Sequence, residues 1–172
     1  AILKILSNTG LIKSDEKNIL VKAKSLQKTA LFLEKTGQTI AKKLSGKTPI
    51  IYSSDKFRPI AMIWKIKINE NAKTPAFYNV YSELNHNEMV GFTLPQGKFH
   101  VITLLDKNDH PRVIKRMRLT ASLLKKKGIE TTIVEMENEH IFNTLFSSLL
   151  LSDWVSYYLA LTYKQDPTPV QM

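Results

Sequence analysis

Apolar residues recur at helical spacing in the first part of the chain and then give way to short apolar runs. From residue 16 to residue 43 these positions follow a 3.6-residue period, with Ser14 and Asp15 as candidate N-terminal caps. The pattern predicts one or two helices, which Gly46 closes as a C-terminal cap. The apolar run at 50–52 then predicts a short buried strand.

The segment that follows this run carries two competing patterns. Apolar spacing from Phe57 to Ile68 fits a helix that Ser54 or Asp55 would cap. Residues 64–68, however, alternate apolar and basic side chains, which is typical of a half-exposed strand. The local pattern does not decide between helix and strand here.

The remainder of the chain alternates predicted helices and strands. In order, the pattern predicts a short helix at about 79–89, a loop at 91–97, a strand at 99–105, a helix opened by Asp109 and Pro111 and closed by Gly128, a strand at 131–134, and a helix from 138 to about 163. This alternation is typical of an α/β domain with a mostly parallel sheet and helices on both faces. Because ligands bind at the carboxyl ends of such strands, the loops after 52, 105 and 134 are of most interest.

Composition supports a single folded domain and excludes several chemistries. The chain has 172 residues, 43% of them hydrophobic and none of them cysteine, so disulfides, zinc–thiolate sites and cysteine nucleophiles are excluded and the cytoplasm is the expected compartment. The N-terminal AILKIL interrupts its apolar run with a lysine, so no secretory signal is expected. The most apolar segment, 145–163, contains Asp153 near its middle, which favours a buried helix over a membrane span.

A net charge of +10 raises nucleic acid as a partner. Ten lysines and only three acids fall within residues 1–50, so the excess lies mainly in one segment. Phe32 is the only aromatic residue there, whereas binding of single-stranded nucleic acid commonly uses aromatic stacking platforms. A solvated lysine-rich helix is therefore the preferred interpretation, and a nucleic-acid role is not expected.

Motifs of several enzyme classes are missing. The sequence has no Gly-x-Gly-x-x-Gly, no Walker-type phosphate loop, no His-Glu-x-x-His and no Gly-x-Ser-x-Gly. The histidines lie far apart without paired ligand spacing, so no metal site is expected; they are His86, His100, His110 and His140.

Two polar segments and one pair of serines are the candidates for chemistry. The segments at 69–77 (NENAKTPAF) and 82–92 (SELNHNEMVGF) are dense in hydrogen-bonding side chains. A carboxylate there could act as a base and an imidazole could move protons between oxygens, although two capped helix ends would have the same composition. Ser53 and Ser54 follow a predicted strand and could either bind an anion or simply cap a helix.

These segments resemble the paired signature of the C-terminal SIS (sugar isomerase) domain of bifunctional phosphoglucose/phosphomannose isomerases. PIIYSSD at 49–55 is similar to the first strand and turn of that family. DWVSYYLAL and DPTPV, within 153–170, are similar to its last long helix and exit. The resemblance covers about 49–170 and implies a three-layer αβα SIS domain with a preceding linker helix.

The resemblance also implies roles for individual residues. Glu70 in NENAK would be the catalytic base that carries a proton between C1 and C2 of an open-chain sugar phosphate, and His86 in LNHN would assist ring opening. In the family this histidine reaches the active site of the neighbouring subunit, so a homodimer is implied, with no cofactor or metal. Glu83 and Glu88 are alternatives for the base on chemical grounds alone. The asparagines of the two motifs are expected at the substrate as positioning groups, together with Ser53 and Ser54; they are Asn69, Asn71, Asn85 and Asn87.

The domain organisation expected from the resemblance is that of half an enzyme. The family has tandem SIS domains, the first of which carries the phosphate-binding loop, and it continues into a helix with an assisting lysine that is expected to be missing from this chain. Residues 1–46 are accordingly expected to be an interdomain tail and linker helix, and 47–172 the C-terminal SIS domain. The expected function is aldose–ketose isomerisation between glucose 6-phosphate and fructose 6-phosphate, with mannose 6-phosphate as a further candidate substrate. The alternative is a non-catalytic SIS-type sensor of sugar phosphates.

Overall fold

Helices and strands alternate along the described part of the chain, which is residues 2–13, 16–136 and 140–169 of a computed structural model. The elements are α1 (Ile2–Asn8), α2 (Glu16–Leu44), β1 (Thr48–Ser53), the 3-10 helix η1 (Asp55–Phe57), α3 (Arg58–Ala72), β2 (Phe77–Val80), α4 (Glu88–Gly91), β3 (Phe99–Leu105), α5 (Pro111–Lys126), β4 (Glu130–Glu135) and α6 (Ile141–Thr162).

The strands form one parallel sheet in the order β2-β1-β3-β4. Its register places Ile51 of β1 between Tyr78 of β2 and Ile102 of β3. Parallel strands need crossover connections, and here α3 and α5 provide them. All carboxyl ends of the strands therefore meet at one edge of the sheet.

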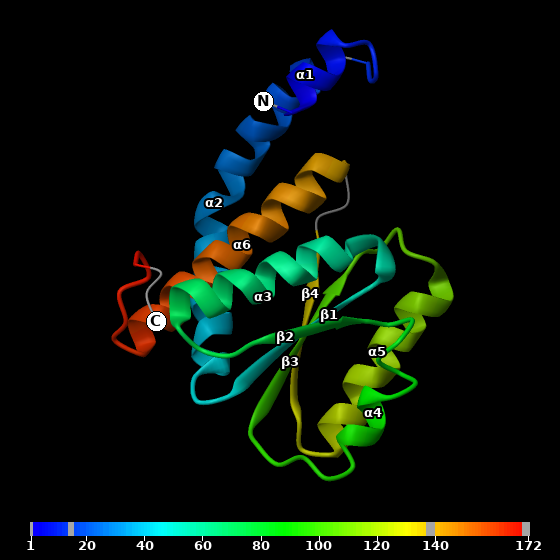
Figure 1. The fold of residues 1–172 in the computed structure, drawn as a ribbon, viewed down its shortest axis with the longest axis vertical. Helices are drawn as coiled ribbons and strands as arrows, with labels where there is room; N and C mark the ends of the chain where they lie inside the picture. The colour runs from blue at the N-terminus through cyan, green and yellow to red at the C-terminus, as the bar shows by residue number, and fades with distance from the viewer. Residues whose placement is uncertain (1, 14–15, 137–139, 170–172) are drawn as a thin grey trace.

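Helices cover both faces of this sheet (Figure 1), which confirms the predicted three-layer αβα architecture. On one face α3 packs against α6, and α6 packs against α2; the core there is built around Trp64, Ile102 and Leu159. On the other face α4 and α5 lie over a smaller core built around Tyr52, Leu84 and Met117. Burial on both sides explains why the central strands read as continuous apolar runs.

Residues 64–68 are part of helix α3, which settles the ambiguity of the local pattern. Trp64 and Ile68, one helical turn apart, are both fully buried against the sheet and α6, while Lys65 and Lys67 are partly exposed. The indole N–H of Trp64 donates to Ser148 Oγ of α6 at 3.1 Å. Burial along one helical face outweighs the alternating pattern.

The short helix predicted at about 79–89 is wrong in type. Residues 77–80 form the edge strand β2, residues 81–87 form a turn, and only Glu88–Gly91 is helical. The backbone N–H of Tyr81 donates to the Ser53 carbonyl at 3.0 Å, which continues the pairing of β2 with β1. The apolar spacing in this segment reflects burial of Tyr81 and Leu84 under a turn rather than along a helix.

The predicted helix caps are only partly correct. Ser54 makes no side-chain capping bond, because η1 intervenes and α3 begins at Arg58. Two histidines act as caps instead, since the Nδ1 atoms of His110 and His140 accept backbone N–H groups at the starts of α5 and α6, each at 3.2 Å.

Gly46 and Gly128 close α2 and α5 with φ of +71° and +78°, as expected for glycine at a helix C-terminus. The cap candidates Ser14 and Asp15 lie outside the described residues. So does residue 138, the predicted start of the last helix.

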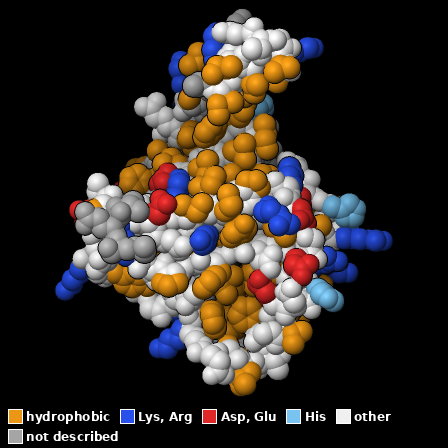
Figure 2. All heavy atoms as spheres, viewed as in Figure 1, with side chains coloured by type: hydrophobic (Ala, Val, Ile, Leu, Met, Phe, Trp, Pro, Cys, Tyr) orange, Lys and Arg blue, Asp and Glu red, His pale blue; other side chains and the backbone are white. Residues whose placement is uncertain are grey.

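Helix α2 extends beyond the sheet and, together with α1, carries exposed apolar side chains, among them Ile5, Leu20 and Val21 (Figures 1 and 2). Its last third belongs to the core, where Ile40, Ala41 and Leu44 are buried. Among the described helices, none combines the length and apolar character that a membrane crossing requires.

The close crossing of α2 and α6 depends on Gly37. A Cβ atom added there would lie 2.5 Å from Trp154 Cβ and 3.1 Å from the backbone nitrogen of Val155. Some of the atoms that a side chain at Gly37 would clash with are backbone atoms of α6. Backbone atoms cannot rotate away, so the two helices would have to separate.

We expect Gly37→Ala to lower the free energy of unfolding by about 1–3 kcal/mol, the usual cost of overpacking a core. Urea denaturation of the chain measures this. Gly91→Ala is the matched control, because nothing lies within 4 Å of a Cβ atom added there and Ala is the better helix former. Equal stability of the two variants would contradict the assigned role of Gly37.

Candidate active site

Ser53 and Ser54 lie at the carboxyl end of β1, where sequence reasoning expects a ligand. Both are buried. The Ser53 hydroxyl donates to the Ser54 carbonyl at 3.0 Å, whereas Ser54 Oγ is buried without a hydrogen-bond partner. The Ser53 hydroxyl is thus bonded within the fold, whereas the Ser54 hydroxyl is available to bind a ligand.

The turn at 81–87 lies beside this corner. The Ser82 hydroxyl and the Arg58 guanidinium hold the pKa of the Asp55 carboxyl below its ordinary value, so the carboxylate stays charged at neutral pH. On the side toward β3, Lys56 Nζ pairs with the buried Asp106 carboxylate at 2.7 Å. Polar groups from the ends of β1, β2 and β3 therefore converge at one edge of the sheet.

Glu70 lies in the last turn of α3, and its neighbours are bound into the fold. Asn69 Oδ1 accepts the backbone N–H of Ala76 at 2.8 Å, which fixes the path from α3 into β2. Asn71 Nδ2 donates to Ser156 Oγ of α6 at 2.9 Å. The Glu70 side chain is exposed, and no residue of the described chain makes a hydrogen bond or ion pair with its carboxylate.

His86 has a similar setting in the turn at 81–87. Asn85 Nδ2 donates to Thr120 Oγ1 of α5 at 2.9 Å, although the buried Asn85 Oδ1 has no partner. Asn87 Nδ2 donates to Glu83 Oε1 at 2.6 Å on the surface. The His86 imidazole is exposed and has no hydrogen-bond partner among the described residues.

The structure does not bring Glu70 and His86 together within one copy of the chain. Helix α3 runs back across the sheet, so Glu70 lies near the edge where the strands begin (Figure 1). Strand β2 then runs parallel to β1, and His86 follows its carboxyl end. The four residues of β2 alone span about 13 Å. His86 therefore lies at the carboxyl end of the sheet, as Ser53 and Ser54 do, whereas Glu70 lies at the opposite end of the strands.

Glu88, one of the alternative bases, is committed to the fold. Its Oε2 accepts the Tyr52 hydroxyl at 2.7 Å and its Oε1 accepts Asn79 Nδ2 at 2.5 Å. Glu83, by contrast, is exposed, and among the described residues its carboxylate accepts a hydrogen bond only from Asn87. Sequence reasoning missed the roles of Tyr52 and Asn79; an asparagine in a strand, where it is disfavoured, was the available signal.

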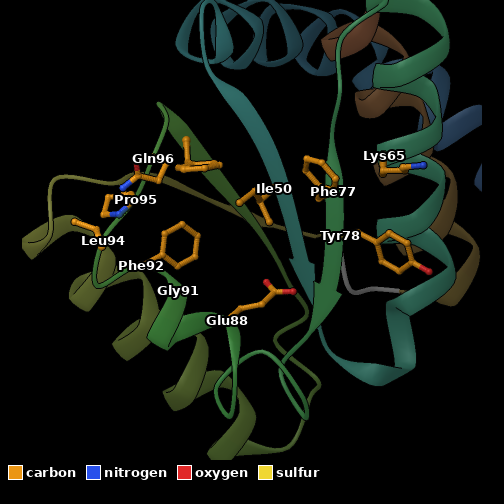
Figure 3. A pocket seen from close by; sticks show the side chains of 11 residues that line it. Ile50, Lys65, Phe77, Tyr78, Glu88, Gly91, Phe92, Leu94, Pro95 and Gln96 are labelled. Atoms are coloured by element: carbon orange, nitrogen blue, oxygen red, sulfur yellow. The ribbon is translucent and has the colours of Figure 1, made fainter.

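Glu88 also lines an open pocket of about 590 Å³ beside β1 and β2 (Figure 3). The walls are mainly apolar and come from the sheet and the loop after α4, with Ile50, Phe77, Phe92 and Leu94 among them. Neither Glu70 nor His86 lines this pocket. This cavity is therefore separate from the two sequence-predicted catalytic groups.

Metal-ligand geometry is not found in the described ranges, where no group of three or more His, Asp or Glu side chains is placed to hold an ion. His100 is a buried residue of β3, with Nε2 2.8 Å from Thr132 Oγ1. Burial lowers its pKa. His100 is thus a residue of the strand expected at 99–105.

Comparison with known families gives a match that spans most of the chain. The family described as the bacterial phosphoglucose isomerase C-terminal SIS domain matches residues 33–172. The chain belongs to this SIS family. Its match begins inside α2, so the family's domain includes the part of that helix that is buried in the core.

Curated relatives of this SIS domain carry a common name. A bifunctional phosphoglucose/phosphomannose isomerase from Aquifex aeolicus is 34% identical over 171 residues, which cover 98% of this chain and 52% of that protein. One of the same name from Caldicellulosiruptor bescii is 44% identical over 135 residues, covering 75% of this chain and 39% of that protein. The chain thus spans about half the length, or less, of these relatives.

Solved structures agree on the fold. A glucose-6-phosphate isomerase-like protein from Thermus thermophilus superposes with a TM-score of 0.61 at 21% identity, covering 76% of this chain and 42% of that one. At this identity the likeness concerns the architecture alone. It shows that the arrangement of sheet and helices described above is shared by that protein.

We expect Asn69→Ala to lower the free energy of unfolding by about 1–3 kcal/mol, because it leaves the buried backbone N–H of Ala76 without an acceptor. Asn87→Ala is the control, since its surface bond to Glu83 is worth little. Thermal or urea unfolding distinguishes them, and a stable Asn69→Ala variant would show that this asparagine does not hold the end of α3.

Proposed function

We propose that this chain is the C-terminal SIS domain of an aldose–ketose isomerase that interconverts glucose 6-phosphate and fructose 6-phosphate. Mannose 6-phosphate is proposed as a second substrate, because the curated relatives at 34% and 44% identity are named for both sugars. The division into a tail and linker helix at 1–46 and a domain at 47–172 belongs to the same proposal. The lack of cysteine favours the cytoplasm for this enzyme.

One observation supports the assignment of the catalytic groups. In the two polar motifs, the asparagines Asn69, Asn71 and Asn85 are bonded to other elements of the fold. The Glu70 carboxylate and the His86 imidazole lie beside them, exposed and without hydrogen-bond or ion-pair partners among the described residues. A base and a proton-transferring imidazole must be free to meet substrate, and these two side chains meet that requirement.

The proposed mechanism moves one proton along the sugar. The Glu70 carboxylate takes the proton from C2 of the open-chain aldose phosphate, and the C–H electron pair forms the C1–C2 double bond of an enediolate. The electron pair of the C1 carbonyl moves onto the C1 oxygen, which becomes a hydroxyl by taking the proton that the C2 oxygen gives up. Glu70 then returns its proton to C1, which gives the ketose. His86 opens the sugar ring and moves protons between oxygens, because an imidazole can both donate and accept a proton near neutral pH.

His86 in this proposal acts on the site of a neighbouring copy. Glu70 and His86 of one copy lie toward opposite edges of the sheet, too far apart to act on the same pair of carbon atoms. A two-fold symmetric homodimer would place Glu70 of one copy beside His86 of the other, and would do so twice.

The remaining parts of the site are assigned in the same proposal. Ser53 and Ser54 are the candidates within this chain for binding phosphate, because they end β1 and Ser54 Oγ has no partner. The other half of the enzyme would supply the main phosphate-binding loop. Asn69, Asn71, Asn85 and Asn87 are proposed to act by positioning the two catalytic groups and the segments around them.

The first test is a coupled assay for isomerisation of fructose 6-phosphate. We expect weak or no turnover by the 172-residue chain and full turnover by the gene product extended to the length of its relatives, because orientation of the phosphate is needed for efficient proton transfer. Full activity of the shorter chain would instead place the phosphate site within it. Inactivity of both proteins would favour the alternative of a non-catalytic sugar-phosphate sensor.

The shared site can be tested by mixing two inactive variants. We expect Glu70→Gln and His86→Ala to abolish turnover separately in the extended protein while sugar phosphate still binds. Co-refolded in equal amounts, they should recover about a quarter of wild-type turnover per chain, because half of the dimers carry one intact site of two.

A double variant with both changes in one chain, mixed with wild type, is the control. It leaves mixed dimers without an intact site and should give no gain over the wild-type dimers present. No recovery in the first mixture would contradict the shared site, and wild-type turnover by Glu70→Gln would remove Glu70 from the mechanism.

A further inference from the structure

The C-terminal side of the turn that carries His86 is held to the sheet by the carboxylate of Glu88. Glu88 begins α4, two residues after His86. Each of its oxygens accepts one hydrogen bond, from Tyr52 of β1 at 2.7 Å and from Asn79 of β2 at 2.5 Å. Figure 3 shows the Glu88 side chain reaching from α4 toward these two strands.

Both donors are themselves fixed. Tyr52 is fully buried, and its ring packs edge-on against Tyr81 with 6.0 Å between centroids. Asn79 uses its other side-chain atom, Oδ1, to accept the backbone N–H of Val80 at 2.8 Å. The amide orientation of Asn79 is therefore determined, and its Nδ2 can only donate to Glu88.

The hydroxyl of Tyr52 stays a donor at every working pH. Burial raises its pKa, and the hydrogen bond to the Glu88 carboxylate raises it further. The Glu88 carboxylate, the Tyr52 phenol and the Asn79 amide thus form a network in which every donor and acceptor is determined.

The turn is also anchored on its other side. Leu84 is fully buried and Asn85 is bonded to Thr120 of α5. His86 lies between these anchors and Glu88, and its own side chain projects into solvent. The flanking residues therefore set the backbone position of His86, while its imidazole makes no bond of its own among the described residues.

We infer that Glu88 is a positioning residue, which with Tyr52 and Asn79 fixes the turn at 81–87 and so aims the His86 imidazole out of its own copy toward the substrate. This inference rests on the proposed function for the role of His86. It assigns no contact between Glu88 and the sugar.

The hydrogen-bond pattern allows a swap of charge between two residues. Glu88→Gln can still accept from Tyr52, but its amide N–H₂ then faces the Asn79 N–H₂, donor against donor. Asn79→Asp places two carboxylates side by side. In the double variant Asn79→Asp/Glu88→Gln every bond is restored, because the new amide donates to the new carboxylate, whose second oxygen still accepts the Val80 N–H.

We expect each single variant of the extended protein to lose roughly 10- to 100-fold in kcat with KM changed less than about threefold, since misplacement of a catalytic group by about 1 Å has effects of this size. The double variant should return to within about threefold of wild type. Tyr158→Phe is the matched control: it removes a tyrosine hydroxyl that donates to another carboxylate, Glu34 Oε1 at 2.7 Å, between α6 and α2 and outside the turn at 81–87. It should keep kcat within about threefold.

Amide hydrogen exchange of the turn at 81–87 gives a readout that does not depend on turnover. Exchange should quicken in both single variants and return to the wild-type rate in the double variant. If wild type has no isomerase activity, the proposed function fails and this measurement still decides the structural role. If His86→Ala abolishes turnover but Glu88→Gln does not, or if the double variant is no better than the singles, the inference about Glu88 is overturned.

Discussion

Buried polar groups between α3 and α6 have to find partners, and the way they do so determines where the rest of the domain lies. The Trp64 indole N–H bonds to Ser148 at 3.1 Å and the Asn71 amide bonds to Ser156 at 2.9 Å, two helical turns along. Between them, Lys67 pairs with Asp153 at 2.6 Å. Sliding or rotating α3 on α6 would break all of these bonds together and leave buried donors unsatisfied.

This constraint extends to the candidate site. Glu70 precedes Asn71, so the position of the proposed base is set by a contact on the far side of the same helical turn. On the opposite edge, the turn with His86 is fixed by Asn85 and Glu88, which bond to α5 and to the sheet. In both places the residues next to the proposed catalytic side chain make the hydrogen bonds to the fold, and the side chain itself makes none within the described chain. The backbone is thus held rigidly while the side chain stays accessible.

The sequence predicted the layers of this fold well because they depend on long periodic segments. Residues 99–105 and 111–126 were clear from their patterns, whereas β2 was missed, since a four-residue edge strand with a polar Asn79 carries little periodic signal. Residues 64–68 needed the burial of Trp64 and Ile68 to be assigned. The choice of Glu70 over Glu83 and Glu88 as the base came from the family resemblance. Physical reasoning disfavours Glu88 as a base only once its hydrogen bonds to Tyr52 and Asn79 are known.

Strand β2 lies at the border of the sheet, where unpaired backbone groups invite another chain to add a strand. Because the Tyr81 N–H points to β1, the N–H of Val80 points outward, and Asn79 Oδ1 already occupies it. An edge that is only four residues long and has one outward donor covered by its own side chain is a poor template for strand addition. Strand addition at this border of the sheet is therefore disfavoured, so β2 is a poor seed for aggregation.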